Sequence, residues 1–194
     1  MSGILGNGGS LRPFPATFTF SSTYMYTFLA SVPQKEVFET LASTIAEMGF
    51  TVVGKDENRP WGGFFVIEEA EAPLFIEVFF PHLSLKDFEG FEKLSPKILV
   101  VAPEKRLSWQ YHHRRAEIWK VVGGVAGVVV SNTDEETPLR KLQMGEVVEL
   151  QQGERHRLIG LEMWGIIAEI WQHTDRENPS DEADIVRVQD DFGR

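Results

Sequence analysis

The sequence predicts an all-β domain, a closed antiparallel barrel or jelly roll, with one helix in front of it. From residue 51 onward the chain consists of short segments rich in β-branched and aromatic residues, separated by Gly, Pro, Asn or charged turns. The pattern lacks the helix–strand alternation that would indicate a parallel sheet. Closure suits such a series of strands, because it removes exposed sheet edges and leaves room for a small ligand.

Composition divides the chain into three parts. Residues 1–15 are rich in Gly, Ser and Pro and are expected to form a flexible arm. Residues 16–50 form an extension with one helix, and residues 51–194 form the barrel and its C-terminal tail. Within the extension, residues 18–30 are aromatic and rich in β-formers, which favours an added strand or an oligomer contact and makes a homodimer our expectation.

Residues 33–49 are predicted to be the helix. Pro33 suits a first turn, and Gly49 suits a C-terminal cap. Apolar residues recur at spacings of three or four between them and give one buried face, formed by Val37, Phe38, Leu41, Ile45 and Met48.

The barrel strands follow from the positions of β-formers and turn residues. They are residues 51–53, 64–68, 74–80, 98–101, 107–112, 117–122, 127–131, 147–150, 156–159 and 165–171.

Residues 106–124 contain three potential metal ligands, Gln110, His112 and Glu117. Gln110 and His112 are two apart, so on a strand their side chains leave the same face. Glu117 follows His112 by five residues, and on an uninterrupted strand this odd separation would place it on the opposite face. Convergence of the three side chains therefore predicts a tight corner at residues 113–115 followed by a second strand. On that second strand Trp119 shares the face of Glu117 and is expected to form a wall of the pocket.

A second segment, residues 145–156, ends in His156 and can supply a fourth ligand. Imidazole, carboxylate and amide oxygen together suit a borderline or hard divalent cation. The absence of cysteine excludes thiolate ligands, which argues against copper(I) and iron–sulfur clusters.

Residues 106–124 and 145–156 resemble the two signature motifs of the cupins. The first cupin motif is His-x-His, three or four residues, Glu, six residues and Gly, and it corresponds here to Gln110, His112, Glu117 and Gly124. Residues 107–119 are similar to the cupin region of type II mannose-6-phosphate isomerases. Two outlying pieces agree with that family: Pro60-Trp61-Gly62 resembles its entry motif, and residues 184–194 resemble its terminal signature.

The resemblance implies a cupin-type double-stranded β-helix and a metal-dependent sugar isomerase. It implies Gln110, His112, Glu117 and His156 as ligands of a divalent ion, with zinc as the first expectation and manganese, iron, cobalt or nickel as others. The implied reaction is the aldose–ketose isomerisation of mannose 6-phosphate to fructose 6-phosphate.

Candidate residues for the substrate follow from the same motifs. Arg115, Arg187 and Arg194 match the family's arginines, and a planar guanidinium recognises phosphate through paired hydrogen bonds. Arg115 and His113 are the catalytic candidates, and Arg187, Arg194 and Trp119 are the substrate-binding candidates. The general base stays open between His113, a metal-bound water and an acidic residue of the tail. The tail arginines can equally form a salt-bridged lock with Asp190 and Asp191.

Two other functions fit the same barrel. Arg114 and Ile118 stand where the family pattern has His, so an isomerase or epimerase of an unphosphorylated sugar remains an alternative. A noncatalytic cupin that binds a sugar is the third reading, because fold does not determine function.

Charge and hydropathy indicate which classes of binding partner the protein can have. The formal net charge of -10 disfavours binding to nucleic acid, whose phosphates attract surplus Lys and Arg. No apolar run approaches the roughly 20 residues of a membrane helix, and residues 1–10 lack the pattern of a signal peptide. We therefore expect a soluble, cytoplasmic protein that binds a small sugar or sugar phosphate and neither nucleic acid nor membrane.

Overall fold

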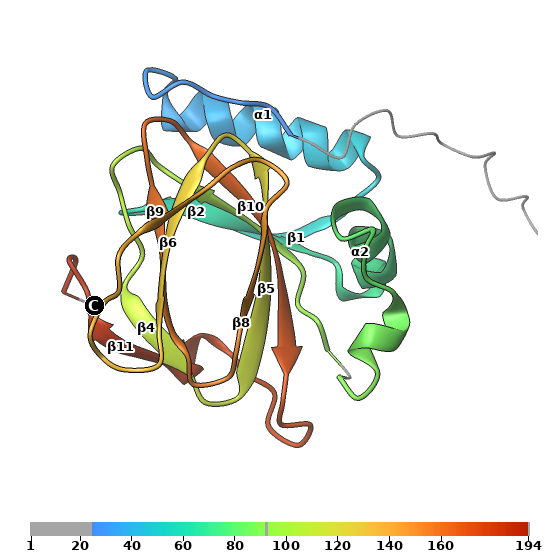
Figure 1. Ribbon diagram of the computed structural model, residues 1–194. Coiled ribbons are helices and arrows are strands. Elements are labelled where there is room, and N and C mark those ends of the chain that lie inside the picture. The colour runs from blue at the N-terminus through green and yellow to red at the C-terminus, as the bar shows by residue number, and fades with distance from the viewer. Residues whose placement is uncertain (1–24, 92, 194) are drawn as a thin grey trace, which may run out of the picture.

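The computed structural model describes residues 25–91 and 93–193, which are arranged as two packed antiparallel sheets with helices outside one of them (Figure 1). The predicted arm, residues 1–15, and the first part of the extension lie outside the described residues. Neither of the α-helices in the described part of the chain has the length and apolar composition needed to cross a lipid bilayer.

The larger sheet has six strands in the order β1-β2-β3-β10-β5-β8. Their bounds are Val52–Arg59, Gly62–Ile67, Lys97–Val101, Gly165–His173, Arg115–Gly123 and Val147–Leu150, in that order. The smaller sheet has five strands in the order β11-β4-β9-β6-β7. Their bounds are Ile185–Gln189, Trp109–His112, Arg155–Gly160, Ala126–Ser131 and Arg140–Leu142.

The six-stranded sheet is covered on both faces, which explains why its central strands are almost wholly apolar. In β3, Leu99 and Val101 face the smaller sheet and belong to the core between the sheets. Their neighbours Ile98 and Val100 face the helices and belong to a second core. The same alternation in β5 places Trp119 and Val121 inside the barrel and Ile118 and Val122 under the helices, as the sequence predicted.

Helix α1 spans Gln34–Glu47 and confirms the predicted helix. Pro33 is its N-cap, and the predicted apolar face is buried against the outer side of the six-stranded sheet. Gly49 follows the helix with a φ of 87°, a left-handed conformation that glycine adopts without a side-chain clash.

The prediction of a strand at residues 74–80 is wrong, because residues 74–79 lie in helix α2, Ala72–Phe79, and Phe80 is its C-cap. Pro73 occupies the first turn, where a missing backbone N–H costs nothing. Phe75 and Phe79 pack on each other with ring centroids 4.7 Å apart, and both also contact Phe50. Burial among these rings favours a helix although the sequence Leu-Phe-Ile-Glu-Val-Phe-Phe is rich in β-formers, because tertiary packing outweighs local propensity.

Two strands of the smaller sheet were not predicted. Strand β7 is three residues long and pairs with β6. Strand β11 lies in the C-terminal tail and pairs with β4, the strand that carries Gln110 and His112. The tail is therefore part of the barrel and lies beside the candidate ligands.

Candidate metal centre

The candidate ligands come from both sheets. His112 is the last residue of β4 and His156 lies on β9, so both belong to the smaller sheet. Glu117 lies on β5 of the larger sheet. The chain bends at His113 and Arg114 to cross from one sheet to the other, which confirms the predicted corner and brings Glu117 to the two histidines despite its odd spacing.

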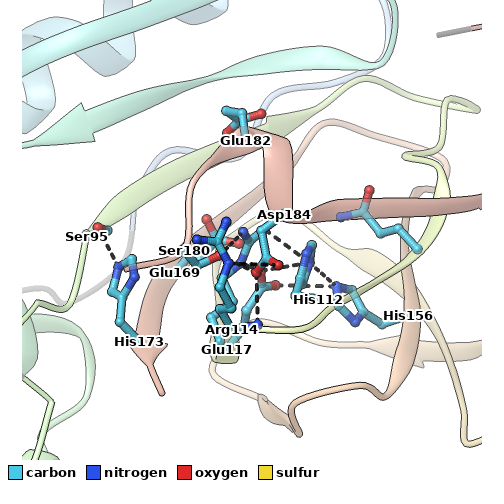
Figure 2. Close-up of polar contacts among 12 residues, drawn as sticks. Ser95, His112, Arg114, Glu117, His156, Glu169, His173, Ser180, Glu182 and Asp184 are labelled. Atoms are coloured by element: carbon cyan, nitrogen blue, oxygen red, sulfur yellow. Dashed lines mark hydrogen bonds and ion pairs between the residues drawn. The ribbon is translucent and has the colours of Figure 1, made fainter. Parts of the chain in front are cut away.

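Three side chains meet at this crossing (Figure 2). The Nε2 atoms of His112 and His156 lie 3.2 Å apart. Glu117 Oε1 lies 3.2 Å from His112 Nε2, and Glu117 Oε2 lies 3.5 Å from His156 Nε2. All three side chains are buried, with 1 to 2% of their surface exposed.

This group fits a divalent cation. Two ligands bound tetrahedrally at 2.0 to 2.1 Å are separated by roughly 3.3 Å, close to the observed separations. The Nδ1 of His156 lies 2.9 Å from the carbonyl oxygen of Glu154, which fixes the proton on Nδ1 and leaves the Nε2 lone pair facing the group. Glu117 Oε2 is buried without a hydrogen-bond partner among the described residues, as expected of an atom placed for a cation.

The electrostatics of the group favour the protonation states that bind metal. Burial lowers the pKa of His156 to about 4, which keeps its imidazole neutral. Burial of Glu117 acts to raise its pKa, but Arg115, His112 and His156 outweigh this effect and hold the pKa well below its ordinary value. The carboxylate is therefore ionised at neutral pH.

Arg115 is part of the ligand group and not of its entrance. Its Nε donates to Glu117 Oε1 at 2.7 Å, and its Nη2 lies 3.1 Å from His112 Nε2. Its Nη1 donates to Ser180 Oγ at 2.8 Å, and its guanidinium lies over the Trp171 ring at 3.6 Å. A cation bound by His112 Nε2 must replace the contact between that nitrogen and Arg115 Nη2. The hydrogen bond from Arg115 Nε occupies only Glu117 Oε1, so Glu117 Oε2 stays available to a cation.

Gln110 lies next to the group on β4, and its Cα is paired with that of His156. Ser108 Oγ donates to its Oε1 at 2.6 Å, which orients the amide. Gln110 and Glu117 line the same cavity. Gln110 thus lies beside His156 on the neighbouring strand and lines the same cavity as Glu117, and its role as fourth ligand stays a prediction.

The cavity beside the ligand group is lined in part by Glu117 and is rich in charged and aromatic side chains. Its basic residues are Arg59, Lys97, Arg115 and Arg187, its acidic residues are Glu117, Glu169 and Glu182, and its aromatic residues are Trp61, Phe64, Trp119 and Trp171. Its volume is about 60 Å³, which holds a few water molecules but is small beside typical ligand pockets of roughly 300 Å³ or more. The tail supplies Glu182, Ile185 and Arg187 to the lining of this small cavity.

Glu169 and Lys97 are site residues that the sequence analysis missed. They are paired across β10 and β3, and Glu169 is in turn paired with Trp119 of β5, so the three form a row across the larger sheet. Trp119 Nε1 donates to Glu169 Oε1 at 2.9 Å. Burial, with a smaller contribution from the Glu117 carboxylate, raises the pKa of Glu169 to about 8. A sequence signal existed, because each is a lone charged residue beside or within an apolar strand.

The other predicted residues divide between the cavity and the surface. Trp119 lines the cavity and contacts the His156 ring edge-on at 5.4 Å, and Arg187 also lines the cavity. His113 is exposed, packs on Tyr111 and does not line the cavity, so we do not retain it as an acid or base. Arg194 lies outside the described residues.

The tail is held by an ion pair at Asp191, as predicted, but its partner is Arg106 and not a tail arginine. Asp191 accepts two hydrogen bonds from Arg106, at 2.6 and 2.9 Å. Arg187, by contrast, faces the cavity.

Comparison with solved structures finds cupin proteins. A Cupin 2 conserved barrel domain protein from Salinispora arenicola aligns at 26% identity with a TM-score of 0.36, over 43% of this chain and 65% of that chain. A mutant of Bacillus subtilis oxalate decarboxylase aligns at 13% identity with a TM-score of 0.49, over 69% of this chain and 30% of that chain. The chain thus spans less than two thirds of the length of either structure. A search of curated proteins finds no match.

Two packed sheets with a His–Glu–His group at their crossing define a cupin-type barrel suited to hold a metal ion. Residues 67–190 match the family described as mannose-6-phosphate isomerase C-terminal, and the match covers more than half of the chain. The chain therefore belongs to this family.

Proposed function

We propose that this protein is a metal-dependent aldose–ketose isomerase of a phosphorylated sugar, with mannose 6-phosphate and fructose 6-phosphate as its substrate pair. Family membership supports the class of reaction. The observation that carries the proposal is the shared cavity, in which the carboxyl of Glu169 lies on the same wall as Glu117, beside a group suited to a cation.

His112, Glu117 and His156 would hold the ion, with the Gln110 amide as fourth ligand, and zinc fits the mixture of nitrogen and oxygen donors. A bound divalent cation supplies a Lewis acid that stabilises negative charge developing on substrate oxygen. Arg115 holds Glu117 Oε1 and so fixes the orientation of the carboxylate.

Glu169 is our candidate for the acid–base group that moves the proton between C1 and C2. Its Oε1 is held by Trp119, which leaves Oε2 for the substrate. A carboxyl whose pKa is raised to about 8 can both lose and regain a proton near neutral pH, which is the condition for general acid–base catalysis. Burial of the cavity limits exchange of that proton with water.

The test is proton NMR of the metal-loaded full chain with mannose 6-phosphate in deuterated water, next to a chelator-treated sample and unphosphorylated mannose. We expect metal-dependent formation of fructose 6-phosphate and little reaction of mannose. Absence of turnover in a sample shown to contain metal would count against the isomerase. Equal turnover of mannose would favour an isomerase of unphosphorylated sugars.

Glu169→Gln tests the acid–base role in the same assay. We expect kcat to fall by about 10²- to 10⁴-fold with KM and metal content nearly unchanged, because the amide cannot transfer the proton. Glu149→Gln, an exposed glutamate on β8, is the matched control. A Glu169→Gln enzyme with unchanged kcat would exclude Glu169 as the acid–base group.

A further inference from the structure

Lys97 is a buried cation whose contacts within the described part of the chain are aromatic rings and one long ion pair. It is 7% exposed, and its Nζ lies 3.3 Å from the centroid of the Trp171 ring and 5.4 Å from that of Phe64. Within the described residues its ammonium group has no hydrogen bond, although an ammonium group carries three donors. Burial also lowers its pKa, against the opposing effect of the Glu169 and Glu182 carboxylates, so the charge is compensated by the Trp171 ring and these carboxylates without a hydrogen bond among the described residues.

Two arginines line the cavity together with Lys97. Arg187 comes from β11, and its Nε is buried without a partner among the described residues. Arg59 comes from the end of β1, and its guanidinium carbon lies 5.5 Å from the centroid of the Phe64 ring, which Lys97 also contacts. Its Nε forms an ion pair with Asp56 at 2.7 Å, which leaves the remaining guanidinium nitrogens for a ligand.

Lys97 has two acidic neighbours, Glu169 on the paired strand and Glu182 of the tail, and the contact with Glu182 is replaceable. Glu182 Oε1 lies 3.5 Å from Lys97 Nζ, longer than a normal hydrogen bond between charged groups. The Glu182 side chain is 54% exposed and belongs to the short turn Glu182–Asp184 of the tail. In Figure 2, Glu182 lies apart from His112, Glu117 and His156, on the tail segment. A half-exposed carboxylate gains little from this contact, because solvent already screens its charge.

We propose that Lys97, Arg187 and Arg59 form the binding site for the phosphate group of the substrate, and that the Glu182 carboxylate occupies this site until an anionic ligand displaces it. The inference rests on the proposed function, since it places one end of that substrate. It assigns the phosphate to a different set of residues from the Arg115, Arg187 and Arg194 clamp expected from the sequence, because Arg115 is directed into the ligand group.

The arrangement of the strands fits a phosphorylated open-chain sugar. Lys97, Glu169 and Trp119 lie on three neighbouring strands, so Lys97 and Trp119 are separated by two strand spacings, or roughly 10 Å. Trp119 contacts His156 of the ligand group. A sugar with its phosphate at Lys97 can thus extend toward the ligand group and place C1 and C2 between Glu169 and the ligands, where Glu169 can reach the proton that moves. Displacing Glu182 also moves the tail segment that restricts the cavity.

Calorimetric titration of the metal-loaded full chain with inorganic phosphate, mannose 6-phosphate and mannose tests the site. We expect Lys97→Met and Arg187→Gln each to weaken binding of the two phosphate ligands by about tenfold or more, as expected for the loss of a charged hydrogen bond, and to leave mannose unaffected. Lys105→Met and Arg140→Gln remove exposed cations and serve as matched controls. In kinetics the same two site variants should raise KM for mannose 6-phosphate more than they lower kcat.

Glu182→Gln tests the displacement. Removing the competing carboxylate should tighten phosphate binding several-fold, whereas Glu177→Gln, an exposed residue of the preceding loop, should not. Unchanged or weaker phosphate binding in Glu182→Gln would overturn the displacement.

The outcomes separate this inference from the proposed function. Phosphate binding that depends on Lys97 and Arg187 in a protein without turnover would support the site and count against the isomerase. Turnover of mannose 6-phosphate with unchanged Kd and KM in Lys97→Met and Arg187→Gln would support the isomerase and overturn the site.

Discussion

The two oxygens of Glu117 have different neighbours, and this division makes the ligand group possible. Oε1 accepts from Arg115, while Oε2 faces His156 and has no hydrogen-bond partner among the described residues. A buried carboxylate needs a compensating charge, and Arg115 provides it whether or not a metal is bound. The guanidinium thus keeps the carboxylate ionised in the absence of the ion.

Glu117→Gln is expected to lose metal and stability together. The amide keeps the shape but leaves Arg115 buried without a counter-charge, which typically costs about 3–5 kcal/mol in the free energy of unfolding. Metal affinity should fall by more than the roughly 100-fold that accompanies loss of a supporting partner, because a ligand itself is lost. Metal analysis and denaturant unfolding measure both effects, with Glu149→Gln as control; a variant with wild-type metal content would contradict the assignment.

Glu169 should make the metal-free protein less stable as the pH rises. Its pKa is raised from 4.5 to about 8, so the native state keeps a proton that the unfolded chain releases between these values. The stabilising contribution is complete below pH 4.5 and is lost as the pH rises through 8. His156, whose pKa falls from 6.5 to about 4, has the opposite dependence, which is confined to pH below 6.5.

Between pH 6.5 and 8 the Glu169 effect can therefore be measured separately from that of His156. Over this range we expect the free energy of unfolding to decrease by about 1–2 kcal/mol in the metal-free wild type relative to Glu169→Gln, measured by urea unfolding at fixed ionic strength. Parallel pH profiles for the two proteins would show that Glu169 is ionised in the native state across this range.

At the scale of elements, the tail is attached to the strand that carries two of the candidate ligands. Ile185 and Arg187 of β11 are paired with His112 and Gln110 of β4. The carboxylate of Asp184 accepts the backbone N–H groups of His113 and Arg114 at 3.2 and 3.0 Å, at the corner where the chain changes sheets. The tail segment and the strand that carries Gln110 and His112 are therefore held together by one set of hydrogen bonds.

Asp184→Asn should loosen the tail without unfolding the barrel. The amide loses the charge that faces Arg114, at 3.3 Å, and disturbs the bond donated by Ser180 Oγ at 2.6 Å. A loss of about 1–3 kcal/mol should appear as faster hydrogen exchange of residues 180–189. Helix α1 is the internal control. Equal acceleration in α1 would indicate global destabilisation instead, and Glu177→Gln should leave both regions unchanged.

At the scale of the whole molecule, the candidate metal centre joins the two sheets. His112 and His156 belong to the smaller sheet and Glu117 to the larger one, so one bound ion links both walls of the barrel. The two cores on either side of the larger sheet stabilise the fold independently of metal, because their residues do not include the ligands.

We therefore expect metal removal to lower the melting temperature without preventing folding. At a free ion concentration 100 times the Kd, binding adds about 2.7 kcal/mol, which corresponds to a rise of about 5–10 °C for a protein of this size. Differential scanning calorimetry of chelated and reloaded samples measures this shift. Glu117→Gln is the control, in which addition of metal should have little effect; a similar rise in that variant would place the ion elsewhere.

Much of this architecture could be predicted locally. The apolar spacing of α1, the alternation along β5 and the spacing of Gln110, His112 and Glu117 are short-range patterns, set by side-chain direction along a helix or strand. The corner between His112 and Glu117 could be predicted because the two residues are separated by an odd number of positions. These features depend on neighbours within a few residues, so the sequence by itself determined them.

Only the tertiary structure decided the remainder. Residues 74–79 lie in a helix because its Phe75 and Phe79 face is buried among aromatic rings, and the tail forms a strand because β4 offers a free edge. Lys97 and Glu169 are far apart in the chain and become neighbours only through the pairing of β3 with β10. Strand order is a long-range property with no local signature, and in this protein it brings the buried carboxyl and the cations to the ligand group.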